Sequence, residues 1–270
     1  MSATIINFVA ILFYFITWLL IIKHVRAQIQ AGGAKQKGKP LYLVLWVLGL
    51  VVHLLGLHYP LFENKPLTLS FFSLASYVMW FISFILFITT IKRRLESLAI
   101  FIIPSAILSI VLAMYLGMSS GVSINVKSGL GAHIFTSLLA YSLLMLASFQ
   151  ALLLAFQNNK LRSLQVSGFS SSLPSLEDME HLLFRFINIG VLFLSIALVT
   201  GFYFLDNLFG SQVAHKTILS LISWVVFSAL IFGRWKYGWR GKKAINWTLA
   251  GFAILMLAFF GTKFVQEFLL

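Results

Sequence analysis

Long apolar segments separated by short polar gaps organise the whole chain. Each segment holds about 20 mostly apolar residues, the length that an α-helix needs to cross the hydrocarbon core of a bilayer. The pattern therefore predicts an all-α, polytopic membrane helix bundle with eight transmembrane helices. The expected spans are Thr4–Ile22, Leu41–Leu57, Leu67–Ile91, Ser97–Gly117, Leu130–Phe156, Phe186–Leu205, His215–Phe232 and Ala244–Val265.

Lysine and arginine are divided unequally between the gaps, and this predicts the orientation. Sixteen of the 20 lie in the first, third, fifth and seventh gaps. The other side receives only Lys65, Lys127, Lys216 and Lys263. Short cytoplasmic loops carry the excess of basic residues in membrane proteins. We therefore expect both the N-terminus and the C-terminus on the outside, and seven or nine spans would break the alternation.

Composition excludes several other classes of protein. The chain is 60% hydrophobic and 10% charged, whereas soluble domains carry about a quarter charged residues. The net charge of +13 does not indicate a nucleic-acid partner, because the basic residues fill the gaps and do not form one soluble face. The absence of cysteine from the sequence excludes disulfides and thiolate metal sites. No catalytic motif occurs, so we expect a protein that is not an enzyme, with residues 1–270 as one domain.

The longest gap has two parts of different character. Ser167–Ser175 is rich in serine, which is typical of a flexible loop. Leu176–Phe186 carries Glu177, Asp178 and Glu180 among apolar residues. We expect this second part to form a short amphipathic helix on the membrane surface.

Four of the six histidines are expected at a similar depth near the outer face. His53 lies in the outer third of the second span and His58 at its outer end, while His133 and His215 begin the fifth and seventh spans. A neutral imidazole is a good ligand for haem iron, and two on facing helices would hold one haem between them. Alternatively, His58 is an amphipathic interface residue, and His215 marks an interfacial helix start beside Lys216. Ordinary roles stay equally open for His53 and His133.

Other side chains at the outer end of the sixth span also have two interpretations. Asp206, followed by Asn207, would either orient an imidazole through its second nitrogen or cap the end of the helix. The aromatic residues there would either pack a flat macrocycle or face lipid; they are Phe202, Tyr203, Phe204 and Phe209. By contrast, His24 and His181 lie on the cytoplasmic side, where we interpret them as solvated.

Two stretches of the chain resemble a known family. One is HIFTSLLAYS, residues 133–142, and the other begins with GRWKYGWRG, residues 233–241. The second continues with WTLAGF at 247–252 and FFGTKFV at 259–265. Together they resemble the cytochrome c assembly family, which includes CcsA, CcmC and HemX-like haem-handling proteins. The resemblance covers essentially the whole chain and is strongest from Leu130 onward.

The resemblance implies a multi-pass protein of the bacterial inner membrane that binds haem b non-covalently near its outer face. It gives His133 the role of an axial ligand, with His53 or His215 as the second. Relatives of this subgroup also tend to place a histidine in the second span. Lys127 or Lys216 would then pair with a haem propionate.

One segment departs from the family pattern and leaves two functions open. Haem-handling members carry a W-G-x-x-W-x-W-D segment in an outer loop, whereas Phe202–Thr217 contains no tryptophan. The protein would therefore hold or handle haem without the usual platform for transfer. Alternatively, it is a non-enzymatic accessory or regulatory protein that keeps the fold and acts on other membrane or cytochrome c biogenesis proteins. A small-molecule transporter comes third, because inverted repeats and broken helix pairs are not recognisable.

Overall fold

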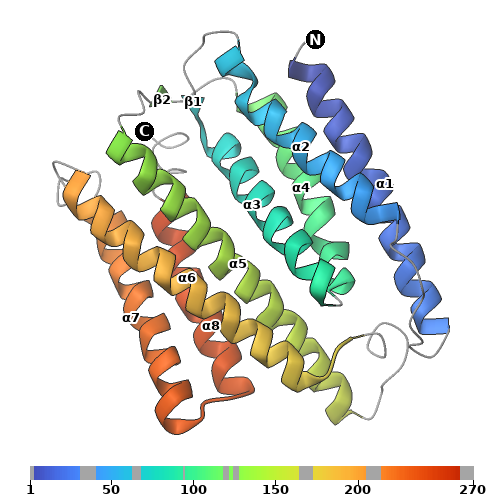
Figure 1. The fold of residues 1–270 in the computed structure, drawn as a ribbon. Coiled ribbons are helices and arrows are strands. Elements are labelled where there is room, and N and C mark those ends of the chain that lie inside the picture. The colour runs from blue at the N-terminus through green and yellow to red at the C-terminus, as the bar shows by residue number, and fades with distance from the viewer. Residues whose placement is uncertain are drawn as a thin grey trace. The chain divides into compact units, whose positions relative to one another are not determined.

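A computed structural model of the chain describes residues 3–30, 41–62, 68–93, 95–117, 122–123, 128–163, 173–204 and 214–261. Within these residues, eight helices are long and apolar enough to cross a membrane, as the hydrophobic pattern predicts (Figure 1). They are α1 (Ala3–Gln30), α2 (Leu41–Phe62), α3 (Phe71–Lys92), α4 (Glu96–Leu116), α5 (Ser128–Arg162), α6 (Leu176–Phe204), α7 (Ala214–Tyr237) and α8 (Lys242–Met256).

The helices belong to two compact units. The first comprises Met1–Asn125 with Lys160–Pro174 and therefore contains α1 to α4. The second comprises Val126–Asn159 with Ser175–Leu270 and contains most of α5 together with α6 to α8. Two packed units can belong to one domain, so a single domain over residues 1–270 stays a prediction.

In the first unit, α1 packs against α2 and α4, and α3 packs against the same two helices. Three tryptophans join two of these pairs, α1 with α4 and α2 with α3, because each indole N–H donates a hydrogen bond to a neighbouring helix. An indole N–H without a partner would be costly in an apolar interior. The bonds run from Trp18 to the carbonyl of Ile100, from Trp46 to the hydroxyl of Ser83 and from Trp80 to the carbonyl of Leu50, at 2.9, 2.8 and 2.8 Å.

A short antiparallel ribbon joins two connections of the first unit. Its strands are β1 (Thr68–Leu69) and β2 (Val122–Ser123), with Thr68 opposite Ser123. The ribbon ties the chain just before α3 to the chain that follows α4. The sequence does not predict it, because two residues per strand are too few to show an alternating pattern.

In the second unit, α7 packs against α6 and α8. A π-helical turn, η2 (Leu257–Gly261), continues α8 and also packs against α7. Polar side chains join the helices across these interfaces. The bonds run from Gln150 of α5 to the carbonyl of Met179, from Trp224 of α7 to Ser195 of α6, and from Ser223 of α7 to the carbonyl of Gly251 in α8.

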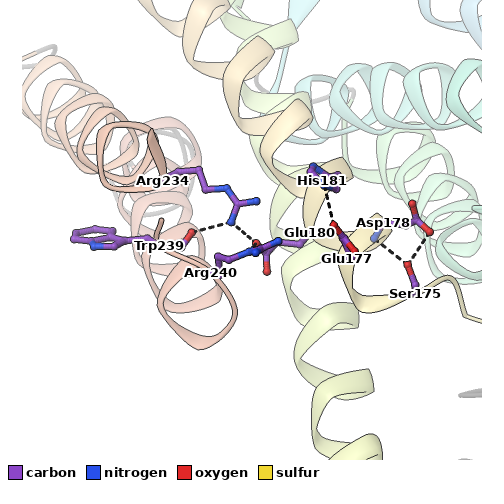
Figure 2. A network of polar contacts seen from close by, with 8 residues as sticks. All are labelled: Ser175, Glu177, Asp178, Glu180, His181, Arg234, Trp239 and Arg240. Carbon is purple, nitrogen blue, oxygen red and sulfur yellow. Dashed lines mark hydrogen bonds and ion pairs between the residues drawn. The ribbon is translucent and has the colours of Figure 1, made fainter. Parts of the chain in front are cut away.

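The predicted surface helix at Leu176–Phe186 is wrong, because this segment is the first part of α6, which continues to Phe204. Glu177 and Asp178 lie in its first turn, where the helix dipole favours acidic groups. Ser175 caps that turn by accepting from the amide of Asp178 at 3.1 Å and donating to its carboxylate at 2.7 Å (Figure 2). The apolar side chains that follow are buried in the unit; they are Met179, Leu182, Leu183, Phe184, Phe186 and Ile187.

The turn between α7 and α8 explains the spacing of the GRWKYGWRG motif. The amide of Trp239 donates to the carbonyl of Gly233 at 3.1 Å, and the amide of Gly238 to that of Arg234 at 3.2 Å. The bond from Gly238 to Arg234 is the 5→1 bond of an αL cap, a helix end that favours glycine in the left-handed conformation. Gly238 has φ 64° and Gly241 has φ 55°. A Cβ atom on Gly233 would overlap the Trp239 indole.

A nearly buried carboxylate holds this turn against α6. Glu180 accepts hydrogen bonds at one oxygen from Arg234 and from Arg240, the latter at 3.2 Å (Figure 2). Its other oxygen accepts from the amide of Gly241 at 3.1 Å. Arg234 also donates to the carbonyl of Trp239 at 3.2 Å. The Glu180 side chain is 11% exposed, so its charge requires these donors. We call Glu180, Arg234, Arg240 and Gly241 the carboxylate node.

Glu180→Gln is expected to lower the free energy of unfolding by about 2 kcal/mol or more, because two arginines lose their counter-charge in a partly buried site. Unfolding of the detergent-solubilised protein, followed by circular dichroism as sodium dodecyl sulfate is added, measures the change. Glu177→Gln is the control, because Glu177 is 72% exposed and, among the described residues, its carboxylate pairs with His181 alone; we expect a change within about 0.5 kcal/mol. Equal stability of the two variants would contradict the role of the node.

Candidate functional site

His133 is held by a hydrogen bond from one ring nitrogen to α6. Its Nδ1 lies 2.9 Å from the carbonyl oxygen of Ala197 and 3.4 Å from the hydroxyl oxygen of Thr200, both on α6. A carbonyl oxygen can only accept, so the Nδ1 atom carries the proton and the Nε2 atom keeps its lone pair. The ring is half-buried, and among the described residues Nε2 has no hydrogen-bond partner. In many proteins a metal-bound histidine is oriented in the same way, by a hydrogen bond from the ring nitrogen that does not bind the metal.

The contact of His133 with α6 joins the start of α5 to the end of α6. His133 lies in the second turn of α5, and Ala197 and Thr200 lie in the last two turns of α6. The carbonyl of Ala197 has two lone pairs, so it can accept from the imidazole as well as from its own helix. The hydrogen bond therefore joins α5 to α6 without breaking either helix.

Lys216 lies at the same end of the second unit. Its ammonium group is close enough to His133 for its charge to act on the imidazole. The Lys216 ammonium also lies 5.3 Å from the centre of the Phe259 ring in η2. Pairing of Lys216 with a haem propionate stays a prediction. Lys127, the other candidate, lies outside the described residues.

His215 stands next to Lys216 in the first turn of α7. Its side chain is exposed. Among the described residues, no hydrogen-bond partner of its ring is found. The second unit therefore contains two of the four predicted ligands, His133 and His215.

An aromatic cluster that sequence reasoning missed lies in the same unit, two turns deeper along α5 than His133. Its centre is Tyr141, whose ring lies 4.9 Å from Phe259 and 5.4 Å from both Phe252 and Phe260. The repeated phenylalanines of the FFGTKFV stretch are its only signal in the sequence.

The aromatic residues at the end of α6, which were expected either to pack a macrocycle or to face lipid, are largely exposed where the structure describes them. Phe202, Tyr203 and Phe204 are 70%, 77% and 53% exposed. The other members of that prediction, Phe209, Asp206 and Asn207, lie outside the described residues.

His53 is a fully bonded histidine in the core of the first unit. Its Nδ1 lies 3.3 Å from the Tyr14 hydroxyl of α1, and its Nε2 lies 3.0 Å from the Ser76 hydroxyl of α3. Its side chain is 1% exposed. Because both ring nitrogens already have partners, coordination of iron would break one of these hydrogen bonds.

His58 lies about a turn and a half beyond His53 on α2. Its Nδ1 donates to the carbonyl of Leu54 at 3.1 Å. Its ring meets the Tyr77 ring edge-on, with 5.7 Å between ring centres. Its Nε2 has no partner among the described residues, so His58 also keeps a lone pair for a ligand.

The structure thus divides the four predicted ligands between the two units. His53 and His58 belong to the first unit, and His133 and His215 belong to the second. Within the described parts of the chain, no group of three or more histidine, aspartate and glutamate side chains is arranged to hold a metal ion. Ligation of iron by any pair of these histidines stays a prediction.

Comparison with known proteins identifies the family. The profile of a family described as Cytochrome C assembly protein matches residues 41–270. The inner membrane protein YpjD of Escherichia coli K12 is 29% identical over 223 residues, which are 82% of this chain and 84% of YpjD. The cytochrome c biogenesis protein CcsA of Prochlorococcus marinus NATL1A is 29% identical over 109 residues, which are 40% of this chain and 33% of CcsA. No solved structure matches.

The family profile extends from the start of α2 to the end of the chain, so it includes all four candidate histidines and the GRWKYGWRG turn. The inner membrane location printed for YpjD agrees with the eight apolar helices. The chain is a multi-pass membrane protein and belongs to the cytochrome c assembly protein family.

Proposed function

We propose that this protein binds haem b non-covalently in its second unit, with His133 as an axial ligand. The observation that carries the proposal is the hydrogen bond from His133 Nδ1 to the carbonyl of Ala197. This bond leaves Nε2 unprotonated, and it orients the ring before any ligand arrives. An oriented neutral imidazole is the usual protein ligand of haem iron.

The surroundings of His133 suit the other parts of a haem. A porphyrin is a flat apolar ring, and the half-buried Phe252, Phe259 and Phe260 around Tyr141 would offer aromatic surface for packing. Its two propionates require cations, and Lys216, at the same end of the second unit as His133, would supply one. Bound haem would supply an iron centre, while the chain itself would bind and orient it and limit the access of water.

For the second axial position we favour His215. It shares a unit with His133, its side chain is exposed, and its ring nitrogens are not engaged by the described residues. His53 is the less favourable choice, because ligation would leave either Tyr14 or Ser76 without its partner in an apolar core. His58 keeps its Nε2 atom available and remains a further candidate.

We propose that haem is held and not transferred. The segment Phe202–Thr217 contains no tryptophan, although the haem-handling members of the family carry a tryptophan-rich platform there. A non-enzymatic role in binding haem or in presenting it to another protein of cytochrome c biogenesis is consistent with these residues.

The absence of the tryptophan-rich platform also favours a second function. The protein would then be an accessory or regulatory partner of another membrane protein, and it would keep the family fold without haem. Purification distinguishes the two functions, because the partner would co-purify with colourless protein.

We also propose that both termini lie outside the cytoplasm. The division of lysine and arginine between the gaps supports this orientation. It places the carboxylate node at the cytoplasmic face and His133 near the outer one.

Replacement of His133 by alanine tests the haem ligand. Protein purified in detergent from haem-replete cells is expected to show a Soret band, and His133→Ala is expected to retain less than about a tenth of it, because the iron loses its oriented ligand. His24→Ala is the control, since His24 bonds to Gln28 of its own helix. A colourless wild-type protein, or an unchanged band in His133→Ala, would contradict the proposal.

Two further alanine variants separate the candidates for the second position. His215→Ala is expected to convert a six-coordinate spectrum into a five-coordinate one. His53→Ala is expected to keep the wild-type spectrum but to lower the free energy of unfolding by about 1–3 kcal/mol, because two buried hydroxyls lose their partner. The reverse pattern of spectra would assign the ligand to His53.

The orientation is tested with single cysteines, which the cysteine-free sequence makes simple. In intact spheroplasts, a membrane-impermeant maleimide is expected to label Ser2→Cys, which precedes α1. Lys243→Cys, in the first turn of α8, is expected to react only after the membrane is permeabilised. Labelling of Lys243→Cys alone in intact spheroplasts would show the opposite orientation.

A further inference from the structure

The turn between α7 and α8 carries more positive charge than its surroundings neutralise. Its basic residues are Arg234, Lys236, Arg240, Lys242 and Lys243, and residues 233–243 include no acidic residue. Glu180 is shared by the two arginines. The three lysines are exposed, and among the described residues none of them forms an ion pair.

Aromatic rings lie beside these lysines. The ammonium group of Lys236 lies 5.6 Å from the ring centres of both Phe232 and Tyr237. That of Lys243 lies 5.0 Å from the ring of Trp239. Trp235, next to Lys236, is 82% exposed. Exposed aromatic residues at the end of a membrane span mark the depth of the lipid headgroups, so the lysines lie at headgroup depth as well.

The backbone that carries these side chains is fixed. The backbone bonds from Gly238 and Trp239 to the end of α7, the two glycines with positive φ and the carboxylate node together define one conformation of the turn. A site that is ordered before its ligand arrives loses less conformational entropy on binding.

We propose that this turn, residues 232–243, binds the headgroup phosphate of an anionic phospholipid in the leaflet at that end of the protein. Lys236, Lys242 and Lys243 would supply the charge, since each basic residue near a membrane surface strengthens attraction to anionic lipid several-fold. The lipid's acyl chains would lie along exposed apolar residues of α7, among them Val225 and Phe232. These exposed apolar side chains favour a lipid over an acidic protein segment.

Native mass spectrometry of the full-length protein in detergent tests the proposal. Dioleoyl phosphatidylglycerol and dioleoyl phosphatidylcholine are added at equal concentration, and the ratio of the two bound lipids is measured. The wild-type protein is expected to prefer phosphatidylglycerol. The triple variant K236Q/K242Q/K243Q is expected to lose at least about tenfold of that preference.

A matched triple variant distinguishes a specific site from general electrostatic attraction. K92Q/R162Q/R185Q removes three exposed basic residues from α3, α5 and α6 and is expected to keep the wild-type preference. Equal losses in the two triple variants would overturn the proposal. The variant K236R/K242R/K243R, which preserves the charge, is expected to keep the preference, and its loss would likewise overturn the proposal.

Two soluble competitors separate the lipid from other anions. Millimolar glycerol 1-phosphate is expected to leave bound phosphatidylglycerol in place, because it lacks the acyl chains. Its displacement of the lipid would show a site for a free phosphate and would overturn the proposal, as would displacement by polyglutamate at equal charge. None of these outcomes depends on haem.

Discussion

A bilayer core offers no hydrogen-bond partners to an imidazole, a carboxylate or an indole N–H, so each buried polar group must find its partner inside the protein. The two units meet this constraint in different ways. In the first unit, hydroxyls on α1 and α3 satisfy both nitrogens of His53. In the second, the carboxylate node satisfies Glu180 with two arginines and a backbone amide.

The constraint also separates structural histidines from candidate ligands. A histidine whose two nitrogens are bonded, such as His53, contributes to the packing of its unit. His133 has one nitrogen bonded to a helix carbonyl and the other without a partner among the described residues. Such a half-satisfied imidazole suits a ligand that provides the missing bond. The proposed binding of haem therefore follows from the way in which the second unit satisfies its polar groups.

Much of the fold could be predicted from the sequence, because apolar length alone determines which segments can cross a bilayer. The eight long apolar helices are confirmed. The start of α6 was mispredicted, since its charged first turn conceals the buried face that follows. The partners of His53, His133 and Glu180 could not be predicted, because each lies at least 23 residues away along the chain. Sequence spacing gives no measure of such contacts, although the GRWKYGWRG motif did indicate a special turn.

The most direct test of the account is the amount of haem b bound to each chain. The pyridine haemochrome assay on protein purified from haem-replete cells measures it without any assumption about ligands. The account predicts close to one haem for each chain. A ratio near zero, in protein that is folded and monodisperse, would contradict it.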